Sequence, residues 1–69
     1  MKDQRLKCFG NAVRRERKLK GLSQEALANL ANIDRSYMGH IERGEKNVTL
    51  TKIYQLADAL DIPVSKLLT

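Results

Sequence analysis

One side of the segment from residue 35 to residue 43 carries polar side chains that could contact nucleic-acid bases. Met38 and Ile41, together with Ile33 just before the segment, fix the buried side of an expected helix, so other residues of the segment fall largely on the opposite side. The outward residues are Arg35, Ser36, Gly39, His40 and Arg43. An arginine in the first turn of a helix that enters the major groove can bind guanine O6 and N7 with two hydrogen bonds, so Arg35 is the first candidate for base recognition.

Ser36, Gly39 and His40 complete the predicted base-reading set. Ser36 can donate to or accept from several bases. Gly39 inside a helix costs about 1 kcal/mol relative to alanine, and close approach to DNA or to a neighbouring helix would offset that cost. His40 could contact a base or a phosphate, and its protonated form would add attraction to an anion. The alternatives are an ordinary surface serine at position 36 and an ordinary surface glycine at position 39.

A second set of residues is predicted to bind phosphates. Gln24 stands at the start of an expected helix, where exposed backbone N–H groups and the helix dipole favour an anion. Polar and basic residues follow the 35–43 helix, and phosphate contacts of that kind position a protein without reading sequence. The predicted phosphate-binding residues are Gln24, Tyr37, Arg43, Lys46, Asn47 and Thr49. Half-buried packing is the alternative for Tyr37, and a helix-cap role is expected for Thr49 in any case.

Arg17 and Glu42 extend apolar stripes and are predicted to pair with each other. Arg17 lies four residues after Val13, and Glu42 lies four residues after Met38. A charge on an apolar face is costly to bury alone, so the two are expected to form a structural ion pair. The alternative is two separate exposed charges that contribute little to stability.

These residues require short helices to position them. Leu6, Phe9 and Val13 form one helical stripe. Three polar residues, at 23, 34 and 49, each have an apolar neighbour just before and another four residues later, the pattern of a capped helix start. The pattern predicts helices at about 4–19, 24–30, 35–43, 50–60 and, after Pro63, 63–68. Asn32 can adopt the left-handed conformation that ends the second helix. We therefore expect one all-α domain over residues 1–69.

Length and composition exclude several classes of protein. Sixty-nine residues allow one small core and no roomy enclosed active site. Apolar runs are far shorter than the roughly 20 residues that span a bilayer, and the N-terminus has no signal-peptide pattern, so a cytoplasmic protein without membrane contact is expected. One cysteine and one histidine exclude an intramolecular disulfide and argue against a zinc site. We expect no catalytic residues, metal, cofactor or small-molecule ligand.

The charge distribution favours a polyanionic partner. The formal net charge is +5, and residues 1–20 contain eight basic and two acidic residues. Such asymmetry is typical of proteins that bind nucleic acid, although a merely soluble basic surface is the alternative. Charge alone does not separate the two.

Three segments carry a resemblance to a known family. Residues 21–28 (GLSQEALA), 33–38 (IDRSYM) and 41–44 (IERG) resemble the Xre family, the Cro and phage-repressor type of helix-turn-helix protein. The resemblance covers about residues 9–68. Residues 34–37, the loop 42–47 and residues 49–50 are most similar to controller proteins of restriction-modification systems. Asn32 stands where the family usually has glycine, and Val48 where many members have proline.

The resemblance implies a five-helix, lambda-repressor-like domain in which the second and third helices form the helix-turn-helix. The resemblance also implies that Arg17 pairs with Glu42 and that Gln24 binds a phosphate. The implied function is a sequence-specific regulator of transcription that binds double-stranded DNA, controlling a restriction-modification operon. An antitoxin-like module that binds a partner protein is the alternative.

A homodimer on a palindromic operator would read two half-sites, one for each copy. Apolar residues left over at the C-terminus are predicted to form the dimer interface, and they are Ile62, Val64, Leu67 and Leu68. The alternatives are a monomer and residues that cap the core.

Overall fold

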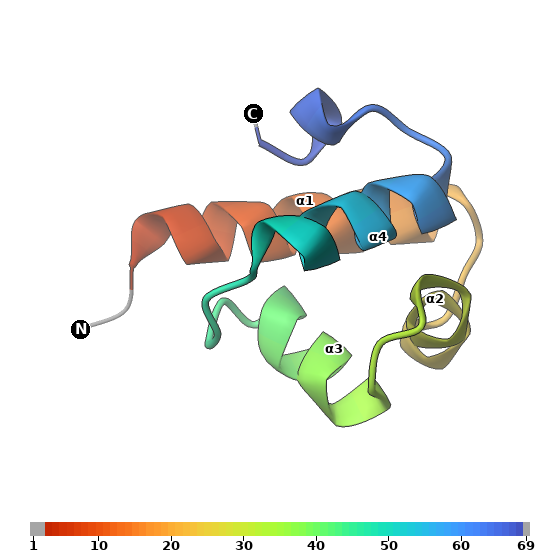
Figure 1. Ribbon diagram of the computed structural model, residues 1–69, viewed down its shortest axis with the longest axis horizontal. Coiled ribbons are helices and arrows are strands. Elements are labelled where there is room, and N and C mark those ends of the chain that lie inside the picture. Colours follow the sequence, from red (N-terminus) through yellow and green to blue (C-terminus); the bar gives the residue numbers. More distant parts are fainter. Residues whose placement is uncertain (1–2, 69) are drawn as a thin grey trace.

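The computed structural model describes residues 3–68, which form four α-helices and one short 3-10 turn. The helices are α1 (Gln4–Leu19), α2 (Gln24–Ala31), α3 (Arg35–Glu42) and α4 (Leu50–Leu60), followed by the 3-10 turn η1 (Val64–Lys66). α3 contacts α1 and α2, and α4 contacts α1, α2 and η1. In Figure 1, α2 and α3 lie on one side of the α1 and α4 pair, and the C-terminal segment lies on the other.

Polar side chains cap the starts of all four helices. The Ser23 hydroxyl accepts from the backbone N–H of Ala26 at 3.0 Å. Asp34 and Thr49 accept in the same way from residues three further along, at 3.2 Å and 3.3 Å. These three caps confirm the prediction, whereas the cap of α1 by Asp3 was not predicted. Capped N–H groups fix where α2, α3 and α4 begin.

A left-handed residue sets the angle between α2 and α3. Asn32 has φ 59° and ψ 44° at the end of α2, as predicted for this position. Asparagine adopts this conformation more readily than most residues, so no glycine is needed there. Asp61 ends α4 with φ 56°, a feature that the sequence analysis missed. The three-residue link from Asn32 to the Asp34 cap turns the chain sharply into α3.

The fifth helix that the sequence predicts over 63–68 is not confirmed, because this segment contains only a short 3-10 helix. Only Val64–Lys66 is helical, and its hydrogen bonds are of the i to i+3 type, from Lys66 N–H to the Pro63 carbonyl at 3.0 Å and onward. Leu67 turns inward and is 1% exposed. The Arg15 guanidinium donates to the Lys66 carbonyl at 3.1 Å. Core packing and this contact hold the segment as a single turn.

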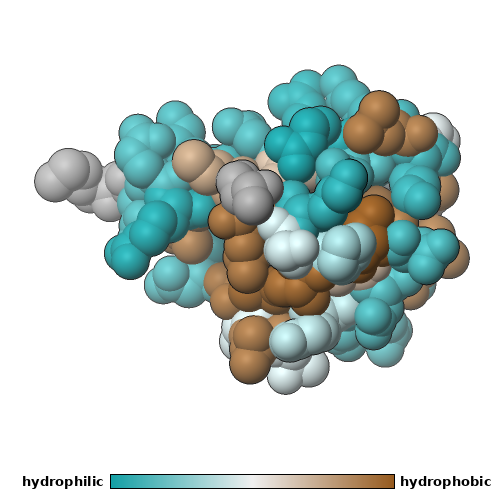
Figure 2. All heavy atoms as spheres, turned by 90° about the horizontal axis from the view of Figure 1, so that it is seen from above, coloured by the Kyte–Doolittle hydropathy of each residue, from teal (hydrophilic) through white to brown (hydrophobic). Residues whose placement is uncertain are grey.

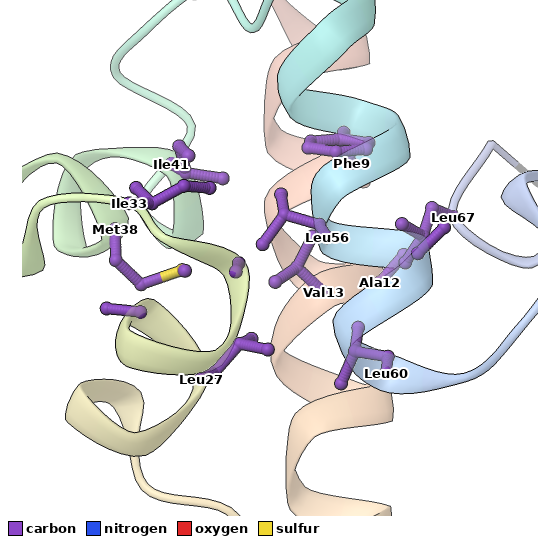
Figure 3. Close-up of a cluster of buried hydrophobic side chains, with 13 residues drawn as sticks. Phe9, Ala12, Val13, Leu27, Ile33, Met38, Ile41, Leu56, Leu60 and Leu67 are labelled. Carbon is purple, nitrogen blue, oxygen red and sulfur yellow. The ribbon is translucent and has the colours of Figure 1, made fainter.

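The core lies between the α1–α4 pair and the α2–α3 pair (Figure 3). Val13, Leu27, Met38 and Leu56 are its fully buried centre. Leu30 is 61% exposed because Leu27, Ala28 and Ala31 occupy the inward side of α2. The core therefore presses α2 and α3 against α1 and α4.

Candidate nucleic-acid interface

A buried ion pair fixes the end of α3. The Arg17 Nε donates to Glu42 Oε2 at 2.7 Å, and a terminal guanidinium nitrogen of Arg17 donates to Glu42 Oε1 at 3.1 Å. The two side chains are only 11% and 4% exposed. Arg17 also donates to the Leu22 carbonyl at 2.8 Å, and the Gln24 amide donates to Glu42 at 3.2 Å. The ion pair predicted from the two apolar stripes is therefore present. The further contacts with Leu22 and Gln24 use most of the hydrogen bonds that the Arg17 and Glu42 side chains can still make.

A glycine allows α1 to approach the end of α3 closely. A Cβ on Gly10 would lie 2.7 Å from the Glu42 carbonyl oxygen and closer still to that of Ile41. Both obstacles are backbone atoms, which cannot move aside like the end of a long side chain. Gly10 therefore sets the separation of the two helices. The sequence signal was a lone glycine inside a helical pattern, which we did not interpret.

Two predicted base-reading residues are open to solvent at the start of α3. Ser36 is exposed, and the Arg35 side chain is 69% exposed. Arg35 lies 3.5 Å from Glu25 of α2, which is 63% exposed. An ion pair this open contributes little free energy, so Arg35 can exchange its partner easily. Glu25 was not predicted as that partner.

His40, Arg43 and Glu45 form a charged cluster at the other end of α3. Glu45 Oε1 is 2.7 Å from His40 Nδ1 and 3.2 Å from Arg43 Nε. The hydrogen bond with His40, and the one with Arg43, lower the pKa of the Glu45 carboxyl from its ordinary value of 4.5. Glu45 was not predicted as a site residue, because it reaches His40 only through the turn at Gly44, where φ is +73°.

Gly39 is buried, which corrects its predicted place on the open outward surface. A Cβ there would lie 3.1 Å from an Arg43 guanidinium nitrogen and 3.5 Å from Gln24 Oε1. The ends of these polar side chains, one from Arg43 and one from Gln24 of α2, cover it. Gly39 therefore makes room for Arg43 and Gln24.

The residues predicted to bind phosphates surround α3 and differ in how much of each side chain is exposed to solvent. Lys46, Asn47 and Thr49 are exposed, whereas Gln24 and Tyr37 are half-buried. The Tyr37 hydroxyl donates to the Asn47 carbonyl at 3.1 Å. Lys52 of α4 lies 5.4 Å from the centre of the Tyr37 ring and adds a positive charge that the sequence analysis missed. The α3 surface is therefore bordered by basic and polar groups.

The predicted dimer residues do not form one exposed set. Leu67 belongs to the core, and Ile62 and Val64 are partly buried against it, so the prediction is wrong for Leu67. Leu68 is 60% exposed. A shallow groove beside it is lined by Gln4, Arg5, Cys8, Phe9, Leu67 and Leu68. Figure 2, which views the side that carries the C-terminal segment, shows hydrophobic side chains gathered there.

Residues 3–68 contain no cluster of three or more His, Cys, Asp or Glu side chains that could hold a metal ion. None of the helices in this part of the chain is long and apolar enough to cross a bilayer. Cys8 is exposed.

Comparison with known proteins assigns the chain to a family. Residues 13–67 match the family model HTH_3, described as helix-turn-helix. The control protein C.SmaI of Serratia marcescens is 49% identical over 57 residues, which cover 83% of this chain and 68% of that protein. The control protein C.MunI of a Mycoplasma species is 40% identical over 60 residues, 86% of this chain and 81% of that one.

Solved structures agree with this assignment. The restriction-modification controller protein C.AhdI from Aeromonas hydrophila superposes with a TM-score of 0.88 at 53% identity, covering 90% of this chain and 94% of that chain. SinR, a regulator of biofilm formation solved in complex with DNA, gives a TM-score of 0.84 at 32% identity, covering 88% of this chain and 98% of that chain. The chain belongs to the HTH_3 family of helix-turn-helix proteins, as its resemblance to the Xre type predicts.

Proposed function

We propose that the protein is a sequence-specific transcriptional regulator that binds double-stranded DNA and controls a restriction-modification operon. The observation that carries the proposal is an α3 whose inner side is locked by the buried Arg17–Glu42 pair while its outer side presents Arg35 and Ser36 to solvent. The similarity to C.SmaI and C.AhdI favours this function over a partner-binding module. A DNA target also implies action in the cytoplasm.

The proposal divides the α3 surface into two kinds of contact. Arg35 enters the major groove and binds guanine, with Ser36 and His40 contacting neighbouring base edges. The residues that bind phosphates border it, and they are Gln24, Tyr37, Arg43, Lys46, Asn47 and Thr49. Lys52 adds to the attraction because it lies beside Tyr37. Gly39 contributes only the space beneath Arg43 and Gln24.

A homodimer is part of the proposal, and the fold restricts where its interface can lie. The C-terminal segment lies across the α1–α4 pair from α3 (Figure 1). An interface centred there would point the two α3 helices away from each other, whereas both must face one side of the duplex. Leu50 and Tyr54, 67% and 52% exposed and four residues apart on α4, offer an additional apolar surface nearer the loop that follows α3. We propose that they extend the interface beyond Leu68.

Sedimentation of three variants tests the dimer. Leu50→Asp and Leu68→Asp are expected to shift the protein toward monomer at micromolar concentration. Leu30→Asp is the control, because Leu30 is 61% exposed on α2, a helix that carries neither Leu50, Tyr54 nor Leu68. A monomeric wild-type protein, both free and on DNA, would rule out the dimer.

Footprinting on the DNA upstream of the protein's own gene, followed by binding titrations at several salt concentrations, tests the function. Arg35→Ala should lose about 1 to 3 kcal/mol of discrimination at one base position of each half-site. Lys46→Ala should weaken binding to all sequences alike and reduce the salt slope by roughly one unit. Identical behaviour of the two variants, or equal binding of operator and scrambled duplex by the wild type, would contradict the proposal.

A further inference from the structure

The Nδ1 atom of His40 lies close to two groups, one of which needs a hydrogen-bond donor and the other a hydrogen-bond acceptor. Glu45 Oε1 is 2.7 Å away, and a terminal nitrogen of Arg43 is 3.2 Å away. A ring nitrogen carries either a proton or a lone pair in its plane. It can therefore donate to the carboxylate or accept from the guanidinium, but it cannot do both.

The carboxylate decides which of these contacts is a hydrogen bond. An ionised carboxylate only accepts, and 2.7 Å is the length of a strong bond to a charged acceptor. A lone pair on Nδ1 facing that oxygen would be repelled. Nδ1 therefore carries a proton whether the ring is neutral or charged. Arg43 is held by Glu45 instead, through Nε at 3.2 Å.

We propose that Glu45 is a positioning residue of the α3 surface that fixes the tautomer of His40, so that Nε2 carries the lone pair of the neutral ring. The side chain of His40 is 40% exposed, and the hydrogen bonds of its ring within residues 3–68 all involve Nδ1. Nε2 is therefore the nitrogen that remains to contact a ligand.

The tautomer determines which ligand atoms His40 can bind. Phosphate oxygens are acceptors only, so a neutral Nε2 with a lone pair cannot form a hydrogen bond with them. In the major groove the donors are the amino groups of adenine and cytosine. Given the proposed DNA-binding function, Glu45 thus makes the neutral His40 a reader of adenine or cytosine and prevents it from acting as a phosphate contact.

Nitrogen NMR on the free protein tests the tautomer without any DNA. The chain has one histidine, so both ring nitrogen signals belong to His40. At about pH 8.5, where histidine is neutral, the wild type should show a protonated Nδ1 and an unprotonated Nε2. Glu45→Ala should lose this preference. Asp58→Ala, which removes one carboxylate from α4, should keep it. An unprotonated Nδ1 in the wild type, or an unchanged pattern in Glu45→Ala, would overturn the proposal.

Binding to duplexes that vary one base pair at a time tests the consequence for recognition. Discrimination in favour of adenine or cytosine at one position of each half-site should fall about two- to tenfold in Glu45→Ala, the range expected for loss of one hydrogen bond. A ratio of affinities cancels the general gain from removing a negative charge, and Asp58→Ala controls for it. Unchanged discrimination in Glu45→Ala would overturn the base-reading role. If the wild type binds every duplex equally, the proposed function fails while the NMR result stands.

Discussion

The two sides of α3 carry ion pairs of opposite character. On the inner side, Arg17 and Glu42 are 2.7 Å apart and 11% and 4% exposed. On the outer side, Arg35 and Glu25 are 3.5 Å apart and 69% and 63% exposed. Breaking a buried pair leaves an uncompensated charge, whereas an exposed pair has water as a ready substitute. One helix can therefore be held firmly by one set of charges and keep another set free to change partners.

Glu42→Ala is expected to have the largest effect. It would leave the Arg17 guanidinium buried without its carboxylate and cost about 3 to 5 kcal/mol of unfolding free energy. Denaturant unfolding of this variant and of Glu25→Ala measures both sides of the comparison. Glu25→Ala should cost no more than about 1 kcal/mol. Equal losses would mean that the two pairs do not differ as their burial indicates.

Gly10→Ala should have an intermediate effect and test the same inner side through packing. The added methyl group would lie 2.7 Å from the Glu42 carbonyl oxygen, so α1 and α3 must separate. Overpacking of this kind costs about 1 to 3 kcal/mol. Asn11→Ala is the matched control, because Asn11 is exposed on α1. A thermal midpoint in Gly10→Ala equal to that of the control would show that the helices tolerate the wider spacing.

The smallest effect is expected for Glu45 on the outer side. Because hydrogen bonds from His40 and Arg43 lower its pKa below 4.5, its contribution to stability is present above the pKa of the unfolded state. The contribution disappears as the pH falls through the folded-state pKa. The small difference in thermal midpoint between the wild type and Glu45→Ala should therefore close on acidification. A difference that widens in acid would refute this sign.

The predicted parts of the fold are those that local chemistry determines. Ser23, Asp34 and Thr49 were predictable as caps because a cap needs only its own hydroxyl or carboxylate and the next turn. Asn32 was predictable for a similar reason. The single turn at Val64–Lys66, the burial of Leu67 and the exposure of Leu30 depend on contacts between distant segments, which helical periodicity does not contain.

The site shows the same limit. The Arg17–Glu42 contact could be predicted because both residues continue apolar stripes on facing helices. Glu45 could not, because its position depends on the left-handed turn at Gly44, which returns the chain to His40. Gly39 was placed on the correct side of α3, but the sequence did not show that Arg43 and Gln24 fold over it.

The absence of a side chain at Gly10 has a consequence at the opposite surface of α3. Because Gly10 has no side chain, the backbones of α1 and α3 can come into contact. The distance between the axes of these two helices decides how far α3 projects from the body of the protein. In the proposed complex, a methyl group added on the far side would thus change the depth to which Arg35 penetrates a groove, without altering any residue proposed to contact the bases.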